Sequence, residues 1–375
     1  MSKLIMLTNS PGEIGGWFIP LARKIKTSYP EIDIISVLLP CQYASGTEFY
    51  VLQNSGLFSR TIDRKELLRF ILSPSIDDDK KLILQLGGDP YWGTLLKIRL
   101  KSKLYVYSDS MVHINRWADK ILLTDPKFSR GADREVVIGN LILDSIDYSC
   151  YKEGPAVVFL PGSRPYMLEK ILPLMLETAE ILGDSFNVPI KFIISPFIRL
   201  EDLDRYTPDN FKLVEDRFIS PSGRTFYINK GGSWEWTEGV QLAINLPGTN
   251  TLQLALLGIP QITILPLQWA DSIPLEGIIE WIGRIPVLGR RIKHLVVYKA
   301  LPKIKFIALP NIISGEKITE ELIGEITPEV IAQRIIFFLE NRSLLEDMKK
   351  RLKGIKFLSG ASEKIASIIG DELCE

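Results

Sequence analysis

Cysteine and histidine are scarce in this chain of 375 residues, which contains three Cys and two His. Cys41, Cys150 and Cys374 are far apart and form no CxxC pair, so neither a disulfide framework nor a structural zinc site is predicted. His113 and His294 have no partner at a metal-ligand spacing. We therefore expect no metal and no cofactor, and a reducing cytoplasm as the compartment.

Net charge is also absent, because 45 Lys and Arg balance 45 Asp and Glu. A neutral chain has no broad electrostatic footprint for nucleic acid, so a charged partner must be met by a local patch. With 46% hydrophobic and 24% charged residues the composition excludes intrinsic disorder, and the length favours two domains.

No uninterrupted apolar run is long enough to suggest a membrane span. Residues 240–270 carry no charged side chain, but prolines and glycines break the stretch. In lipid they would leave backbone groups without hydrogen bonds. A buried strand, turn, helix and strand is the better interpretation.

Short apolar runs alternate with amphipathic segments of helix length along most of the chain. This pattern predicts an α/β protein with two Rossmann-like parallel sheets. We predict an N-terminal domain over residues 1–150 and a C-terminal domain over residues 151–375, which ends in helices. The predicted strands are 4–8, 34–39, 82–86, 104–107 and 120–123, then 156–160, 191–194, 225–228, 242–245 and 261–264.

Turns between strands and helices are the places to seek a site in such sheets. The first turn, 9–17, contains Gly12, Gly15, Gly16 and Trp17, with Glu13 as its one titratable group. Its glycines suit either a ligand or merely a tight turn.

A second turn, 160–164, holds Gly162, Ser163 and Arg164 after the run AVVF. A helix N-terminus with an adjacent arginine suits a diphosphate, although Arg164 could instead pair with a carboxylate.

Small polar residues fill a third turn in an otherwise uncharged region. They offer hydroxyl, amide and backbone hydrogen bonds to a phosphate or a ribose. These residues are Gly248, Thr249, Asn250, Thr251 and Gln253. Asp89 follows another strand, where it would act as a general base or simply cap the next helix.

Several motifs, in this order, resemble those of the lipid-A-disaccharide synthases, inverting glycosyltransferases of the GT-B type. GEIGGW (12–17) stands in place of GE-x-SGD, and VIGNLILDS (137–145) resembles VGHPLLD. LPGSR (160–164) is identical to the family motif. GTNTLQLALLGIP (248–260) resembles GTATLEAALLGTP, and LPNIISGEKITEEL (309–322) follows LPN-x-x-x-G.

The resemblance implies a UDP-sugar in the C-terminal domain, an acceptor in the N-terminal domain and a cleft between them. Arg164 and Asn311 carry over as donor-site residues, and either Glu13 or Asp89 as the catalytic carboxylate. Trp17 replaces a family Asp, and Gln253 replaces a family Glu. These departures indicate a divergent paralogue with a different acceptor.

A basic, apolar segment lies between Glu280 and Glu316, where no acidic residue occurs. Cations mixed with aromatic and aliphatic residues fit an element at an anionic membrane surface, or a covered helix with solvated charges. The predicted membrane contacts are Trp281, Arg284, Arg290, Arg291 and Lys293.

The hypothesis from these features is a peripheral enzyme at the inner face of the cytoplasmic membrane. It would transfer an N-acetylglucosamine-type sugar from a UDP-sugar to a lipid or lipid-linked acceptor. The alternatives are a UDP-N-acetylglucosamine 2-epimerase and a non-catalytic paralogue that binds a sugar nucleotide or lipid. A homodimer is left open.

Overall fold

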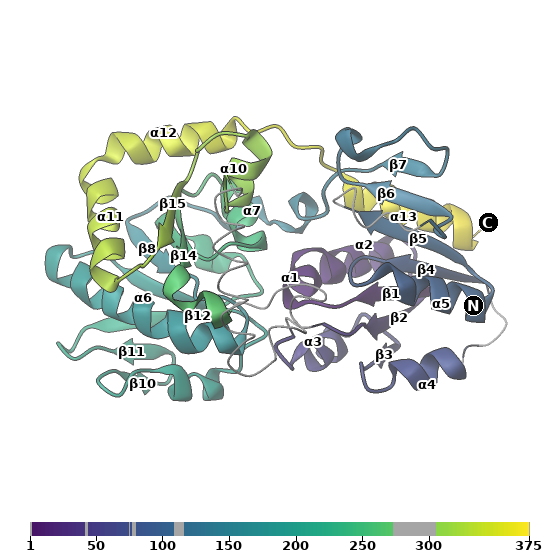
Figure 1. The fold of residues 1–375 in the computed structure, drawn as a ribbon, viewed down its shortest axis with the longest axis horizontal. Coiled ribbons are helices and arrows are strands. Elements are labelled where there is room, and N and C mark those ends of the chain that lie inside the picture. The colour runs from purple at the N-terminus through teal and green to yellow at the C-terminus, as the bar shows by residue number, and fades with distance from the viewer. Residues whose placement is uncertain are drawn as a thin grey trace. The chain divides into compact units, whose positions relative to one another are not determined.

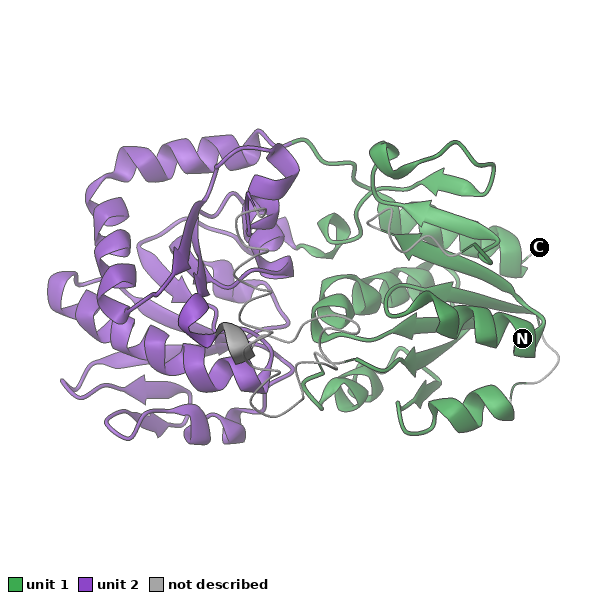
Figure 2. Ribbon diagram, viewed as in Figure 1, with its two compact units in different colours: residues 1–146, 356–375 green, residues 147–355 purple. Residues whose placement is uncertain are grey.

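The computed structural model describes residues 2–41, 44–74, 76, 80–108, 116–272 and 305–374 (Figure 1). The chain divides into two compact units (Figure 2). Unit 1 holds Met1–Ile146 and Lys356–Glu375, and unit 2 holds Asp147–Ile355.

Unit 1 is built on a seven-stranded parallel sheet within the described residues, in the order β3-β2-β1-β4-β5-β6-β7. Its central strands are buried on both faces, which explains their continuous apolar runs. The strands are β1 (Lys3–Thr8), β2 (Asp33–Leu38), β3 (Arg60–Ile62), β4 (Lys81–Gln85), β5 (Lys103–Ser108), β6 (Lys120–Leu123) and β7 (Glu135–Val137).

Helices connect these strands. Helix α2 turns Leu21, Ala22 and Ile25 into the core. The helices described in unit 1 are α1 (Pro11–Glu13), α2 (Ile19–Ser28), α3 (Glu48–Asn54), α4 (Leu67–Leu72), α5 (Pro90–Leu100) and α13 (Ala361–Cys374).

Unit 2 repeats the scheme in an eight-stranded sheet within the described residues, ordered β10-β11-β12-β9-β8-β13-β14-β15. The β10–β11 and β11–β12 pairs are antiparallel, and the other pairs are parallel. The strands are β8 (Ala156–Phe159), β9 (Ile190–Ile194), β10 (Lys212–Val214), β11 (Arg217–Ile219), β12 (Thr225–Lys230), β13 (Val240–Asn245), β14 (Gln261–Pro266) and β15 (Glu320–Gly324).

The core of unit 2 is aromatic at its centre. Phe159 and Phe192 stack with ring centroids 5.2 Å apart, and Phe218 meets Phe192 edge-on at 5.4 Å. Helices pack around this core, among them a long helix that begins directly after LPGSR. They are α6 (Pro165–Ser185), α7 (Thr249–Leu256), α10 (Leu309–Ser314), α11 (Pro328–Glu340) and α12 (Arg342–Lys353).

The C-terminal helix corrects the predicted domain boundary, which assigned residues 151–375 to one domain. Helix α13 belongs to unit 1, where it packs on α2 and β4. Asp144 accepts hydrogen bonds from Gly360 N at 3.0 Å and Ser362 N at 2.6 Å, so a residue of the VIGNLILDS motif anchors the start of this helix. An amphipathic pattern predicts a helix but does not specify the surface that it will cover.

A hydrogen bond fastens the other end of α13 to the sheet. Tyr105 Oη donates to Glu372 Oε2 at 2.6 Å. Burial, together with this bond and the charge of Glu372, raises the pKa of Tyr105, which keeps the phenol protonated as a donor.

We expect Gly370→Ala to destabilise the protein, because a Cβ there would lie 2.2 Å from Tyr29 Cζ. Overpacking costs about 1–3 kcal/mol, which outweighs the roughly 0.5–1 kcal/mol that Ala gains over Gly in a helix. Urea unfolding measures the difference, with the exposed Ser367→Ala as control. When Tyr29 is already replaced by Ala, Gly370→Ala should lower the free energy of unfolding much less. If the losses of the two single variants simply add in the double variant, the contact between Tyr29 and residue 370 is not the cause.

Candidate functional site

Each parallel sheet has one point where the strand order reverses, and the candidate residues gather there. In unit 1 the reversal lies between β1 and β4, which neighbour each other. Ligands of open α/β sheets bind at such switch points, beyond the carboxyl ends of the strands. Glu13 follows β1 and Asp89 follows β4, so the topology brings the turns of both predicted carboxylates together.

Glu13 is half-buried at this switch point. Its Oε2 accepts hydrogen bonds from Thr8 Oγ1 and from Asn9 N, both at 3.3 Å. The carboxylate lies directly against the β4 turn, because a Cβ built on Gly87 would be 1.9 Å from Glu13 Oε2. Only glycine leaves room for the carboxylate here, which ties the GE motif to the glycine pair 87–88.

Asp89 is exposed and caps α5, since its Oδ1 accepts a hydrogen bond from Tyr91 N at 3.0 Å. Gln85, the last residue of β4, fixes the turn, because its Nε2 donates to the carbonyls of Gly87, Gly88 and Asp89 at 2.9–3.3 Å. The capping role that the sequence offered for Asp89 is therefore present. The backbone around it is held by a buried amide.

The glycine-rich turn is more regular than predicted. Instead of an open loop over 9–17, a short helix α1 leads into a π-helical turn, Ile14–Phe18. Ser10 caps this start through its Oγ, which accepts from Glu13 N at 3.4 Å. The predicted acceptor loop is corrected accordingly: Gly12, Gly15, Gly16 and Trp17 are helical residues.

Trp17 is half-buried rather than fully presented to solvent. Its Nε1 donates to Leu86 O at 3.4 Å, and its ring centroid lies 6.1 Å from that of Tyr107. The indole therefore rests on the carboxyl ends of β4 and β5, beside the Glu13 turn.

Arg64 and Glu48 also organise this edge of the sheet, and sequence reasoning missed them. Arg64 donates to Asn9 O at 3.1 Å and to Leu39 O at 3.2 Å, and its Nη1 lies 3.4 Å from Glu48 Oε2. Glu48 is fully buried. These residues belong to no motif, and their spacing in the sequence gives no signal of the contact.

In unit 2 the strand order reverses between β8 and β13. The turns after these strands are adjacent, because Leu160 N donates to Ile244 O at 2.8 Å and a Cβ on Gly162 would lie 3.1 Å from Leu246. Gly162 and Gly248 have φ values of +100° and +148°, which side-chain-bearing residues rarely adopt. Arg164 and Gly248 stand directly before α6 and α7, so two helix N-termini begin here.

The side chains of this pair of turns are partly accessible. They are Ser163, Arg164, Thr249, Asn250 and Gln253. With the backbone N–H groups of the helix starts, they offer donors at one edge of the sheet.

Thr251 has a different place from the one predicted. It is fully buried; its Oγ1 donates to Gly248 O at 2.8 Å and accepts from Leu309 N at 3.0 Å. The hydroxyl therefore holds the GTNT turn to α10 and is not presented to a diphosphate.

A fully buried polar network supports the same turn. Gln261 Nε2 donates to Thr251 O at 2.8 Å, and Gln261 Oε1 accepts from Asn245 Nδ2 at 2.5 Å. Thr263 Oγ1 donates to Asn245 Oδ1 at 2.8 Å. Buried polar groups require partners, so this network fixes β13, β14 and α7 against one another.

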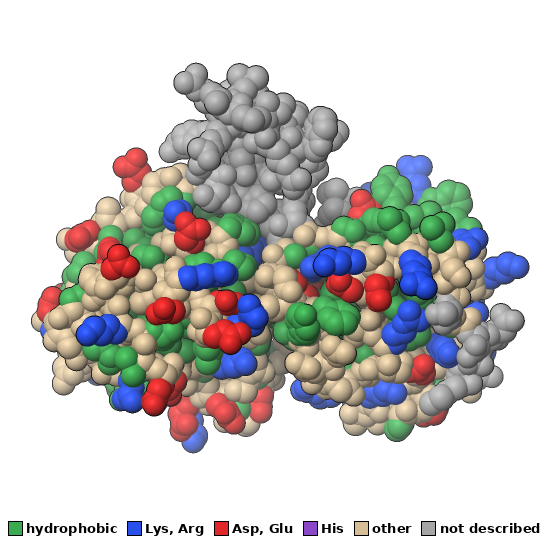
Figure 3. All heavy atoms as spheres, turned by 90° about the horizontal axis from the view of Figure 1, so that it is seen from below, with side chains coloured by type: hydrophobic (Ala, Val, Ile, Leu, Met, Phe, Trp, Pro, Cys, Tyr) green, Lys and Arg blue, Asp and Glu red, His purple; other side chains and the backbone are tan. Residues whose placement is uncertain are grey.

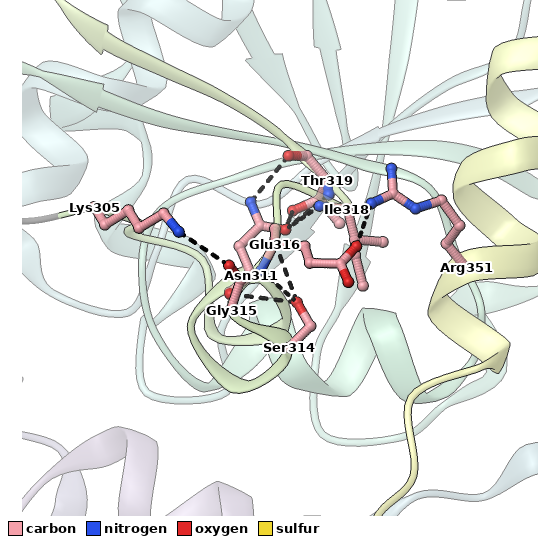
Figure 4. Close-up of polar contacts among 8 residues, drawn as sticks. All are labelled: Lys305, Asn311, Ser314, Gly315, Glu316, Ile318, Thr319 and Arg351. Carbon is pink, nitrogen blue, oxygen red and sulfur yellow. Dashed lines mark hydrogen bonds and ion pairs between the residues drawn. The ribbon is translucent and has the colours of Figure 1, made fainter.

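Asn311 corrects a second donor-site prediction. Its side chain is fully buried at the centre of the α10–β15 connection (Figure 4). The amide donates to Thr319 O, and its oxygen accepts from Ile318 N and Thr319 N at 2.8 Å (Figure 4). The amide also donates to Glu321 Oε1 at 2.8 Å. These bonds occupy the side chain, which shapes the LPN turn and does not face a ligand.

Glu321 completes the connection from the strand side. Its Oε1 accepts from Ile307 N and Ala308 N, at 3.0 and 2.8 Å, just before α10 begins. Glu321, which lies within the LPNIISGEKITEEL segment, thus secures the start of this helix.

The predicted membrane contacts Trp281, Arg284, Arg290, Arg291 and Lys293 lie outside the described residues. Of the helices in the described part of the chain, none has the length and apolarity needed to cross a membrane. In the same part, no three His, Cys, Asp or Glu residues are grouped as a metal site would require.

Comparisons with known proteins agree with the motifs. No protein-family model matches the chain. A lipid-A-disaccharide synthase from Syntrophus aciditrophicus is 23% identical over 268 residues, which cover 68% of this chain and 61% of that protein. One from Sulfurihydrogenibium is 27% identical over 225 residues, covering 58% and 51%. The chain is thus similar in sequence to lipid-A-disaccharide synthases.

The chain spans about half to three fifths of the length of those curated proteins. Among solved structures, the S. aureus MnaA–UDP co-structure has a TM-score of 0.58 at 12% identity and covers 100% of this chain and 97% of its own. A UDP-N-acetylglucosamine 2-epimerase has a TM-score of 0.52 at 13% identity, covering 98% and 96%. These likenesses concern the fold, and the predicted GT-B class is confirmed.

Asn311→Ala should lower the free energy of unfolding by about 2–4 kcal/mol, because it leaves several buried partners unpaired. Chemical denaturation measures the loss. Ile312→Ala, at an exposed neighbour in the same helix, should change stability by less than about 0.5 kcal/mol. If both variants are equally stable, Asn311 does not hold the turn.

Proposed function

We propose that this chain is an inverting glycosyltransferase that moves a sugar, of the N-acetylglucosamine type, from a UDP-sugar to a lipid or lipid-linked acceptor. The observation that carries the proposal is the pair of adjacent turns at the unit 2 switch point. They combine LPGSR and GTNT with two helix N-termini, and both motifs resemble those of the synthases named above.

The unit 2 turns suit the diphosphate of the donor. N–H groups at helix N-termini carry a partial positive charge, and Gly162 and Gly248 let the backbone approach a phosphate closely. Arg164 adds a forked cation that is well matched to phosphate oxygens. Ser163, Thr249 and Asn250 supply further hydrogen bonds, and Gln253 lies one helical turn on, where a ribose would be bound.

In this reaction negative charge develops on the leaving UDP, and the acceptor hydroxyl loses its proton to the protein. The bond between the anomeric carbon and the β-phosphate oxygen breaks, and its electrons leave with UDP. The acceptor hydroxyl attacks the opposite face of the oxocarbenium-like carbon and gives its proton to a carboxylate. Both carboxylates belong to turns of the switch point, and Glu13 is assigned as the base because Asp89 Oδ1 is used to cap α5.

Arg164→Ala should reduce sugar transfer by about 10²–10³-fold, since a preorganised donor contributes ~3–4 kcal/mol to stabilising the leaving charge. Arg164→Lys should recover part of the rate. The assay follows labelled sugar into lipid, with circular dichroism to check the fold. Arg342→Ala is the matched control. Arg342 lies near Pro155 and Pro260, where β8 and β14 begin, and therefore at the edge of the sheet opposite to the candidate site. Unchanged transfer by Arg164→Ala would remove Arg164 from the mechanism.

Glu13→Gln should lower transfer by about 10²–10⁴-fold, the usual contribution of a general base. Asp89→Asn keeps an equally good helix cap and should leave most of the activity. The opposite result would assign the base to Asp89.

Incubation of the chain with labelled UDP-sugars and bacterial membrane lipid tests the function itself. The expected product is a labelled lipid together with released UDP. Interconversion of UDP-N-acetylglucosamine without lipid, followed by NMR, would instead indicate an epimerase. Calorimetric binding of UDP without any transfer would indicate a sugar-nucleotide-binding paralogue.

A further inference from the structure

One polar side chain at the unit 1 switch point has an unused hydrogen-bond acceptor. Asn9 follows β1 directly and is half-buried. Its Oδ1 atom is buried, and no hydrogen-bond partner reaches it in the described part of the chain. A buried acceptor without a partner is costly, so such an atom in a folded protein requires an explanation.

The usual structural reasons for asparagine at the end of a strand do not apply to Asn9. The cap of α1 is the next residue, Ser10. Asn9 is not among the described residues with a positive φ angle, where asparagine is favoured. Its backbone makes the bonds that hold the turn: Asn9 N donates to Glu13 Oε2 at 3.3 Å, and Asn9 O accepts from Arg64 Nη2 at 3.1 Å. The fold therefore fixes the position of Asn9 and leaves its amide oxygen unused.

The Asn9 side chain lies beside the candidate base. A Cβ built on Gly88 would be 3.5 Å from Asn9 Cβ. One built on the preceding Gly87 would be 1.9 Å from Glu13 Oε2, so both side chains lie against the β4 turn. The last torsion of an asparagine side chain is soft, and no hydrogen bond of Oδ1 has to break when it rotates. The oxygen can therefore turn toward the accessible side of this half-buried residue.

The charges on either side of Asn9 select the kind of group that it would bind. The Glu13 carboxylate disfavours an anion, and the Arg64 guanidinium, which is bonded to the carbonyl of Asn9, disfavours a cation. On the face drawn in Figure 3, Lys and Arg side chains of the described residues are interspersed with Asp and Glu side chains in both units, so individual groups rather than a broad field decide the selection. A neutral hydroxyl is the donor that suits this oxygen.

We propose that Asn9 orients the acceptor, with its Oδ1 accepting a hydrogen bond from an acceptor hydroxyl next to the one that reacts. The reacting hydroxyl gives its proton to Glu13, so the two side chains bind two neighbouring hydroxyls. An acceptor with a hydroxyl pair, as on a sugar ring, is then preferred over a lipid with a single alcohol. The inference rests on the proposed function, which it deepens by naming the acceptor chemistry.

Asn9→Leu separates a binding role from a structural one. Leucine branches at Cγ as asparagine does, but it accepts no hydrogen bond. Because the amide oxygen has no partner to lose, the variant should unfold at the same urea concentration as wild type or a higher one. Asn54→Leu, at an exposed position at the end of α3, is the matched control and should keep wild-type stability and transfer. A urea midpoint lowered in Asn9→Leu alone would show that the amide supports the fold, against the proposal.

Transfer to two acceptors tests the orienting role in the full chain. Octyl glucoside carries neighbouring hydroxyls, and octanol carries one. Asn9→Leu should lower kcat/KM for octyl glucoside about tenfold, the loss of one neutral hydrogen bond, and leave the KM for the UDP-sugar and the transfer to octanol unchanged. Unchanged kcat/KM for octyl glucoside, or an equal loss with both acceptors, overturns the proposal.

Binding of octyl glucoside below its micellar concentration distinguishes this inference from the proposed function. Saturation-transfer NMR without a UDP-sugar should show binding to wild type and weaker binding to Asn9→Leu. If this difference is found but no sugar is transferred, the transferase proposal fails and the role of Asn9 in binding hydroxyls stands. If sugar is transferred to membrane lipid but wild type and variant bind octyl glucoside equally, or neither binds it, the role of Asn9 fails and the transferase proposal stands.

Discussion

Reversal of strand order within each parallel sheet is the constraint on which both candidate sites depend. Parallel strands present their carboxyl ends at one edge, and successive crossovers normally carry the chain to the same side. Where the order reverses, the two neighbouring turns lead away from each other and leave space between them. Glu13 and Gly87 meet at this place in unit 1, and Gly162 and Leu246 meet at it in unit 2.

Buried polar groups make those turns rigid. Asn245, Gln261 and Thr251 are fully buried and bonded to one another, and Asn311 with Glu321 does the same for the LPN turn. Arg64 plays this part in unit 1 by joining the ends of β1 and β2. An unpaired buried donor or acceptor costs about 1–3 kcal/mol, so each network permits one arrangement of its turn. The accessible side chains nearby are then presented from a fixed frame.

The motif residues consequently fall into two groups, one with accessible side chains and one whose side chains hold the backbone in place. Arg164, Ser163 and Asn250 are accessible, whereas Thr251, Asn311 and Asp144 are spent on holding backbone segments. A motif therefore records the shape of a site as well as its chemistry. A fold by itself does not specify chemistry, which depends on the individual side chains.

The sequence by itself determined the longer buried strands, their parallel arrangement and the turns that matter, because buried strands need apolar runs and positive φ angles need glycine. It did not predict β3, β7, β10, β11 and β15, or the antiparallel pairing of β11 with β10 and β12. Strand β6 matches its predicted bounds, 120–123, and both turns of unit 2 follow the strands expected. Tertiary structure alone decided that α13 joins unit 1, that residues 11–18 are helical, and that Thr251 and Asn311 face inward. These outcomes depend on contacts between residues far apart in the chain, such as Tyr29 with Gly370 and Thr251 with Leu309, and local periodicity carries no information about such partners.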